Sequence, residues 1–169
     1  MMDKGMSEII LEDNEFYVES GTRCSKLARY VAKHGFKDSA FLAGIPGTIG
    51  GALSMNAGCY GFEIWDFVSK VLLVDLDGNE VVRDKTEFNI GYRKALNKNV
   101  QIEYFLGVWL NFPKGEITSA QKVIEDLLQH RKQTQPIEWP SAGSTFRNPV
   151  NNYAAKLIEE CDSVSYTHL

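Results

Sequence analysis

Several features that mark common classes of protein are missing from this sequence. No apolar run is long enough to span a membrane, and residues 1–5 are polar and carry no signal-peptide core. The formal net charge is −4, and no basic patch is interleaved with aromatic residues. We therefore expect a cytoplasmic protein with neither a membrane nor a nucleic acid as its partner.

Cysteine and histidine are also scarce. Cys24, Cys59 and Cys161 lie far apart and form no CxxC pair, which argues against a disulfide framework and fits a reducing compartment. The three histidines have no ligand-like spacing, so no metal site is expected. What remains is an ordinary composition, 44% hydrophobic and 24% charged, in 169 residues, enough for one or two small domains.

Hydrophobic patterning predicts strands and helices without strict alternation, which favours an α+β fold. Turns are predicted at Asp13-Asn14 and Asp77-Gly78, because these residue types tolerate tight hairpins. Strands are expected over residues 7–11, 16–18, 68–75, 80–83 and 102–111.

Helical spacing is clearest in three places. Apolar residues from Cys24 onwards predict a helix that Thr22 caps and Gly35 ends. Two further helices are expected over residues 116–131 and 153–160.

Residues 41–61 form a segment with six glycines. Glycine admits positive φ and lets a ligand approach the backbone, and consecutive N–H groups can form an anion site. Thr48 follows Pro46-Gly47 and can cap a helix whose N-terminus favours a phosphate. The segment is neither a Walker A loop nor a dinucleotide fingerprint. Glycine content alone therefore leaves a second interpretation open, a packing corner of small residues.

The order of residues in this segment, FLAGIPGTIGGALSMNAGCYG, resembles the flavin-binding signature of the UDP-N-acetylenolpyruvoylglucosamine reductase (MurB) family. The resemblance implies a flavin-binding fold of two subdomains, with FAD bound and NADPH as reductant. It implies UDP-N-acetylglucosamine enolpyruvate as the substrate, reduced to UDP-N-acetylmuramate in peptidoglycan precursor synthesis, and hence a role in cell-wall biogenesis, cell shape and division. The implied cofactor-binding residues are Gly44, Ile45, Pro46, Gly47, Thr48, Gly50, Gly51, Asn56, Ala57 and Gly58.

Two later segments resemble the catalytic motifs of this family. Ile90-Gly91-Tyr92-Arg93 matches the motif whose arginine is catalytic, which implies that Arg93 holds the substrate carboxylate while negative charge develops. Residues 140–149, PSAGSTFRNP, match the segment whose serine donates a proton, which implies Ser144 as general acid. Taken alone, Arg93 would be a solvated arginine and Ser144 a turn serine.

Further candidates rest on fewer signals. Arg131 and Lys132 can meet phosphates, or can simply be cations favoured at the end of a helix. The weaker substrate-binding candidates are Tyr92, Gln135, Arg147 and Asn148.

Both ends depart from the family pattern. The first FAD subdomain has no match before Met1, and the family's catalytic glutamate has no match before Leu169. We therefore expect residues 1–112 to be the second FAD subdomain only, and residues 113–162 to begin an α+β substrate-binding domain, with Pro113 and Gly115 at the boundary. Residues 163–169 are expected to be a non-native tail, because SVSYTHL reads back as a transposon end used in sequencing libraries.

We expect this fragment to be inactive by itself and the complete protein to be monomeric. Two alternatives stay open: another flavin oxidoreductase of the same fold, and a binding fragment without catalysis. The segment around Ser144 argues against the first.

Overall fold

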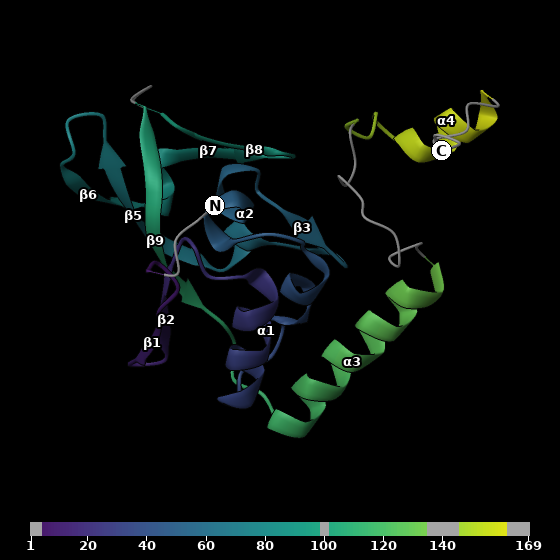
Figure 1. The fold of residues 1–169 in the computed structure, drawn as a ribbon, viewed down its shortest axis with the longest axis horizontal. Helices are drawn as coiled ribbons and strands as arrows, with labels where there is room; N and C mark the ends of the chain where they lie inside the picture. The colour runs from purple at the N-terminus through teal and green to yellow at the C-terminus, as the bar shows by residue number, and fades with distance from the viewer. Residues whose placement is uncertain (1–4, 99–101, 135–145, 162–169) are drawn as a thin grey trace. The chain divides into compact units, whose positions relative to one another are not determined.

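The computed structural model describes residues 5–98, 102–134 and 146–161, and the chain divides into two compact units, Met1–Thr134 and Gln135–Leu169 (Figure 1). The first unit contains a five-stranded antiparallel sheet of order β1-β2-β9-β5-β6. Its strands are β1 (Ile9–Glu12), β2 (Glu15–Glu19), β5 (Val68–Asp75), β6 (Glu80–Asp84) and β9 (Glu103–Asn111). Helices interspersed with an antiparallel sheet confirm the α+β class.

Both predicted hairpin turns are present. Asp13 and Asn14 have φ values of 47° and 69°, the geometry of the tight turn that matches strand twist. In the β5–β6 hairpin, the Asp75 carboxylate accepts hydrogen bonds from the N–H groups of Asp77 and Asn79 at 2.9 and 2.8 Å. Gly78 supplies the positive φ of 86° that this turn requires.

One face of the sheet carries the hydrophobic core. Val71 of β5 and Phe16 of β2 are fully buried, and Phe16 packs edge-on against Phe36 at a centroid distance of 4.8 Å. Leu27 of helix α1 (Cys24–Lys33) and Leu53 of helix α2 (Ile49–Ser54) belong to the same core. Each buried side chain of this size contributes about 1.5–3 kcal/mol of apolar transfer energy.

Helix α1 ends as predicted but begins differently. Gly35 follows the helix at φ 77°, and its N–H donates to the Ala32 carbonyl. The N-cap is Arg23, so the predicted cap at Thr22 is wrong. The Thr22 hydroxyl is buried and donates to the Glu8 carbonyl at 3.4 Å, a tertiary partner that replaces the local one.

Helix α3 (Ile117–Thr134) packs against α1 and the 3-10 helix η1 (Ala40–Gly44), within the first unit. The chain before it is tied to the end of α1, because the Gly115 N–H donates to the Gly35 carbonyl at 2.9 Å. The domain limits at residues 112 and 162 stay predictions. In the second unit, α4 (Ala154–Glu160) agrees with the predicted helix.

Two short hairpins lie beside the glycine-rich segment, and neither was predicted. The first pairs β3 (Gly58–Cys59) with β4 (Phe62–Glu63) and leads into the 3-10 helix η2 (Ile64–Asp66). The second follows η3 (Lys85–Glu87) and pairs β7 (Phe88–Gly91) with β8 (Lys94–Asn97).

In the parts of the chain that the structure describes, no helix is long and apolar enough to cross a bilayer. The same residues contain no group of three or more side chains that could hold a metal ion.

Candidate functional site

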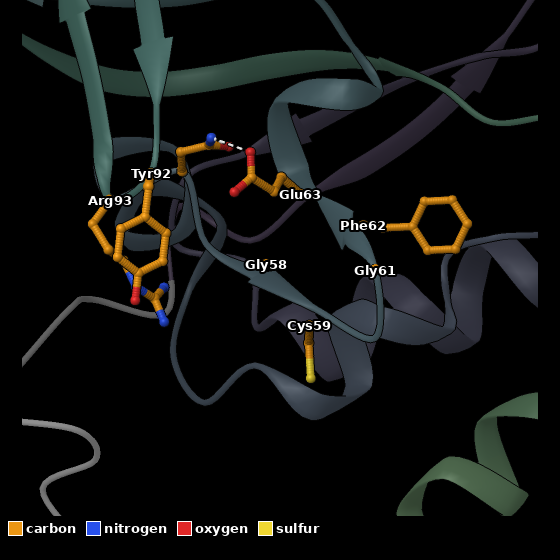
Figure 2. Close-up of a pocket in the computed structure, with 8 residues that line it drawn as sticks. Gly58, Cys59, Gly61, Phe62, Glu63, Tyr92 and Arg93 are labelled. Carbon is orange, nitrogen blue, oxygen red and sulfur yellow. Dashed lines mark hydrogen bonds between the residues drawn. The ribbon is translucent and has the colours of Figure 1, made fainter. Parts of the chain in front are cut away.

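A hollow of about 410 Å³ lies between the β3–β4 hairpin and the turn of the β7–β8 hairpin (Figure 2). It unites the end of the glycine-rich segment with the predicted catalytic arginine, although the two are far apart in sequence. Figure 2 shows Tyr92 and Arg93 on one side of the hollow and Phe62 on the other. The lining residues are Asn56, Gly58, Cys59, Gly61, Phe62, Glu63, Tyr92 and Arg93.

Arg93 reaches the hollow from the two-residue turn that follows Gly91. Its φ of 54° is left-handed, a conformation that costs a residue with a Cβ about 1–2 kcal/mol. The half-buried guanidinium lies 5.7 Å from the centre of the Tyr92 ring. A strained residue that points a cation into a hollow is typical of a functional position.

Asn56 lies under the hollow and is 1% exposed, with a φ of 40°. Its Nδ2 donates to Glu63 Oε2 at 2.6 Å, the dashed line in Figure 2, and to the Gly91 carbonyl at 3.1 Å. Both partners are acceptors, which fixes the orientation of the amide. The Oδ1 atom is buried and has no hydrogen-bond partner among the residues that the structure describes. A buried acceptor without a donor is costly, so this oxygen is suited to an N–H or O–H of a bound molecule.

The hollow has a positively charged side near Cys59 and a carboxylate elsewhere in its lining. Burial raises the pKa of the Cys59 thiol above its usual value, and the guanidinium groups of Arg131 and Arg93 lower it only in part. The raised pKa keeps the thiol mainly protonated at neutral pH, so it is a weaker nucleophile than a free thiol. Two cations near Cys59 make this side positive, which suits a carboxylate or phosphate, while Glu63 supplies a carboxylate elsewhere in the lining.

The glycines of the segment serve two purposes. A Cβ on Gly50 would lie 2.9 Å from Ser20 Cβ, and one on Gly58 would lie 2.8 Å from the Phe62 carbonyl oxygen. The packing interpretation therefore holds at these two positions. Gly47 differs, because it has a φ of 118° with open space beside it, and Gly51 is exposed, with its nearest neighbour atom at 3.9 Å. A ligand can approach the backbone at these two.

Thr48 is the N-cap of α2, as predicted, but its hydroxyl makes no capping bond. The N–H groups of Ile49 and Gly50 donate to the Thr22 and Ser20 carbonyls at 2.9 and 2.8 Å. These two amides of the first helical turn are occupied, so an anion at this segment would have to use other donors.

The other predicted site residues fall into three groups. Gly44, Ile45, Pro46, Gly47, Thr48, Gly50, Gly51 and Ala57 lie on the glycine-rich segment but do not line the hollow. Ser144 and Gln135 lie outside the described residues. Arg147 and Asn148 are exposed in the second unit, where Asn148 Oδ1 accepts from the N–H of Ala154, the first residue of α4, at 3.0 Å.

Sequence reasoning missed half of the lining. Cys59, Gly61, Phe62 and Glu63 enter the hollow because the chain reverses at Tyr60-Gly61, the end of the glycine-rich segment. The signal was present in Tyr60-Gly61, whose φ values are 54° and 86°. A glycine at the second position of a tight turn favours a hairpin.

Comparisons with known proteins place two family matches along the chain. Residues 1–83 match the FAD binding domain family, and residues 135–168 match the C-terminal domain family of UDP-N-acetylenolpyruvoylglucosamine reductase. The second match includes residues 163–168 of the suspected tail. These two families together account for most of the chain.

Relatives named UDP-N-acetylenolpyruvoylglucosamine reductase align along most of the chain. The relative from Nitrosomonas eutropha is 40% identical over 166 residues, covering 92% of this chain and 50% of the relative. The relative from Thiobacillus denitrificans is 44% identical over 145 residues, covering 86% of this chain and 45% of the relative.

A solved structure of UDP-N-acetylenolpyruvylglucosamine reductase (MurB) from Thermus caldophilus has a similar fold. It matches with a TM-score of 0.75 at 31% identity, over 86% of this chain and 53% of that one. The chain thus spans about half the length of the relatives it matches. From the two family matches, the named relatives and the shared fold, the chain belongs to the UDP-N-acetylenolpyruvoylglucosamine reductase (MurB) family.

Proposed function

We propose that this chain supplies the part of the active site of an FAD-dependent reductase that contains the catalytic arginine, Arg93. The complete protein would reduce UDP-N-acetylenolpyruvoylglucosamine to UDP-N-acetylmuramate at the expense of NADPH, a step of peptidoglycan precursor synthesis. The observation that carries the proposal is that Arg93 and the end of the glycine-rich segment, Asn56 and Gly58, line one hollow.

The chemistry of the substrate explains why an arginine belongs there. FAD, when bound, supplies the hydride that adds to the enolpyruvyl double bond. Arg93 would hold the enolpyruvyl carboxylate through two parallel N–H groups and stabilise the negative charge that develops beside it. The positive side of the hollow near Cys59 favours the same anion. A lysine would offer a point charge without the fork.

The residues of this chain fit a flavin in two respects. Gly47 and Gly51 leave the backbone open to a flat ligand, and Asn56 Oδ1 offers a buried acceptor. The second half of the reaction requires a proton. We assign the donor to Ser144, whose hydroxyl can serve as general acid toward a strongly basic carbon.

The three cysteines are free thiols, which supports a reducing, cytoplasmic setting for this reaction.

The test is made on the full-length protein. Purified protein should carry FAD and should oxidise NADPH only when the enolpyruvyl nucleotide sugar is added. Ser144→Ala should leave flavin reduction by NADPH intact and slow turnover by about 10²-fold or more, the usual contribution of a general acid. NADPH oxidation that ignores the sugar, or a fully active S144A variant, would instead favour another flavin oxidoreductase of this fold.

A further inference from the structure

The β7–β8 hairpin is held against the glycine-rich segment at its base. Trp65, the middle residue of η2, is 1% exposed and donates from Nε1 to the Leu53 carbonyl at the end of α2, at 2.8 Å. Its ring lies 4.8 Å from that of Phe88, the first residue of β7. This contact fixes where β7 begins, but it lies at the opposite end of the strand from the Arg93 turn.

The end of β7 has its own attachment. Asn56 Nδ2 donates to the carbonyl of Gly91, the last residue of β7, two positions before Arg93. The same nitrogen donates to the Glu63 carboxylate, which carries the charge that strengthens the bond. Glu63 is in turn placed by η2, since its backbone N–H donates to Asp66 Oδ2 at 2.8 Å.

We propose that Glu63 and Asn56 are positioning residues, which form a link from η2 through the glycine-rich segment to the turn that presents Arg93. The proposal rests on the role proposed above for Arg93. Arg93 adopts a left-handed φ that its residue type disfavours, so something outside the turn must hold it there. Asn56 is bonded next to that turn, and its amide faces two acceptors at once.

Asn56 Oδ1, which accepts no hydrogen bond from the part of the chain that the structure describes, gives the link a second consequence. When a bound molecule donates to this oxygen, the amide is fixed on both sides, and the Gly91 carbonyl is fixed with it. The turn bearing Arg93 should therefore become more protected when the hollow is filled. The ligand class that fits this oxygen is a molecule that presents an N–H or O–H donor to the hollow.

The test uses the full-length protein and three substitutions. Asn56→Asp places a carboxylate against Glu63 and removes the donor to both acceptors. Glu63→Gln is isosteric and keeps an acceptor oxygen for Asn56. Asn89→Ala is the matched control, since Asn89 is exposed on β7 itself.

Amide hydrogen exchange across residues 91–94 reports on the link without any turnover. We expect N56D to speed exchange there about tenfold at pH 8, the factor that matches loss of about 1.4 kcal/mol. N89A should stay within about twofold of wild type, and E63Q, which keeps the acceptor oxygen but loses the charge, should fall between N89A and N56D. Glu63→Ala, at a half-buried position, tests the same link if N56D does not fold.

The two half-reactions give the functional readout. Reoxidation by the enolpyruvyl sugar should slow about 10²-fold in N56D, as expected for a displaced catalytic group, while N89A should keep the wild-type rates of both half-reactions. The positioning role is overturned if exchange across residues 91–94 is unchanged, if it rises equally in the whole domain, or if reoxidation keeps its wild-type rate. If wild-type protein shows no reoxidation by the sugar, the proposed function fails, and the exchange data still decide whether the link exists.

Discussion

Arg131 of α3 donates a hydrogen bond to the main-chain carbonyl of Gly44, the last residue of η1. Tyr60 makes a second attachment, since its hydroxyl donates to the Leu127 carbonyl at 3.3 Å. The sequence predicted that Arg131 either binds a phosphate or is a cation favoured at the end of a helix. In the structure, Arg131 also attaches α3 to the glycine-rich segment. The glycine-rich segment is thus held by contacts with β2, α1 and α3.

Arg131→Met should weaken this attachment. A half-buried hydrogen bond to a charged donor contributes about 1.5–3 kcal/mol, and the apolar part of the side chain is kept. Urea denaturation should show a loss in this range. Lys132→Met, at the exposed neighbouring position, is the control and should change the free energy of unfolding by less than about 0.5 kcal/mol. Equal losses in the two variants would contradict the assignment.

Two adjacent glycines of α2 should serve different purposes: Gly50 allows close packing, and Gly51 leaves the backbone open to a ligand. Gly51→Ala should leave the fold as stable or up to about 1 kcal/mol more stable, because the position is exposed and helical. If FAD lies along this backbone, its affinity should fall about tenfold, since an intruding methyl costs about 1–3 kcal/mol.

Gly50→Ala should instead lower the stability of the fold. Its Cβ would meet Ser20 Cβ at 2.9 Å, so we expect about 1–3 kcal/mol of destabilisation. Thermal unfolding and a flavin-binding titration on both variants make the comparison. Unchanged FAD affinity in G51A would remove Gly51 from the cofactor site.

The Arg83–Glu103 pair should make stability depend on pH. Arg83 Nη2 lies 2.5 Å from Glu103 Oε1, and the bond holds the pKa of Glu103 below its usual range. Because the folded-state pKa is lowered, the stabilisation is full above the unfolded value of about 4.3 and is lost as pH falls through the folded value.

Glu103→Gln should therefore cost about 1.5–3 kcal/mol at pH 7 and less near pH 2, because the stabilisation fades as pH falls through the lowered pKa of Glu103. Urea midpoints at the two pH values measure this difference. Glu80→Gln, on the exposed edge of β6, is the control. A penalty in E103Q that persists undiminished at pH 2 would show that packing, not the charge, is responsible.

The thiols should react in a fixed order. Cys161 is exposed, Cys59 is half-buried with a raised pKa, and Cys24 is fully buried with its pKa raised to about 12. An aromatic disulfide reagent at pH 8 should label Cys161 first, Cys59 slowly, and Cys24 only on unfolding. Ligand in the hollow should slow Cys59 further. Labelling of Cys59 as fast as Cys161 would contradict the described burial.

Local chemistry explains which elements could be predicted. Asp13-Asn14 and Asp77-Gly78 are residue types that favour the conformations they adopt, so both turns were found. The Tyr92-Arg93 turn lacks such residues, and Arg93 is left-handed against its own preference, so the β7–β8 hairpin was missed.

Tertiary partners explain the remaining differences. Thr22 is a residue type that favours helix capping, yet it precedes the N-cap Arg23, and its hydroxyl donates to the Glu8 carbonyl instead. The bond from Asn56 to Gly91 joins segments that no local pattern relates, so the link could only be seen in three dimensions. The resemblance indicated Asn56 and Arg93 separately, and the structure shows them lining one hollow.

The most direct test is the rate at which the enolpyruvyl nucleotide sugar reoxidises reduced flavin in the full-length protein carrying Arg93→Ala. Arg29→Ala, an exposed arginine on α1, is the control. We predict a loss of about 10²–10³-fold for R93A, with flavin reduction by NADPH unchanged and R29A like wild type. Wild-type reoxidation in R93A would contradict the assignment of this hollow as the catalytic site.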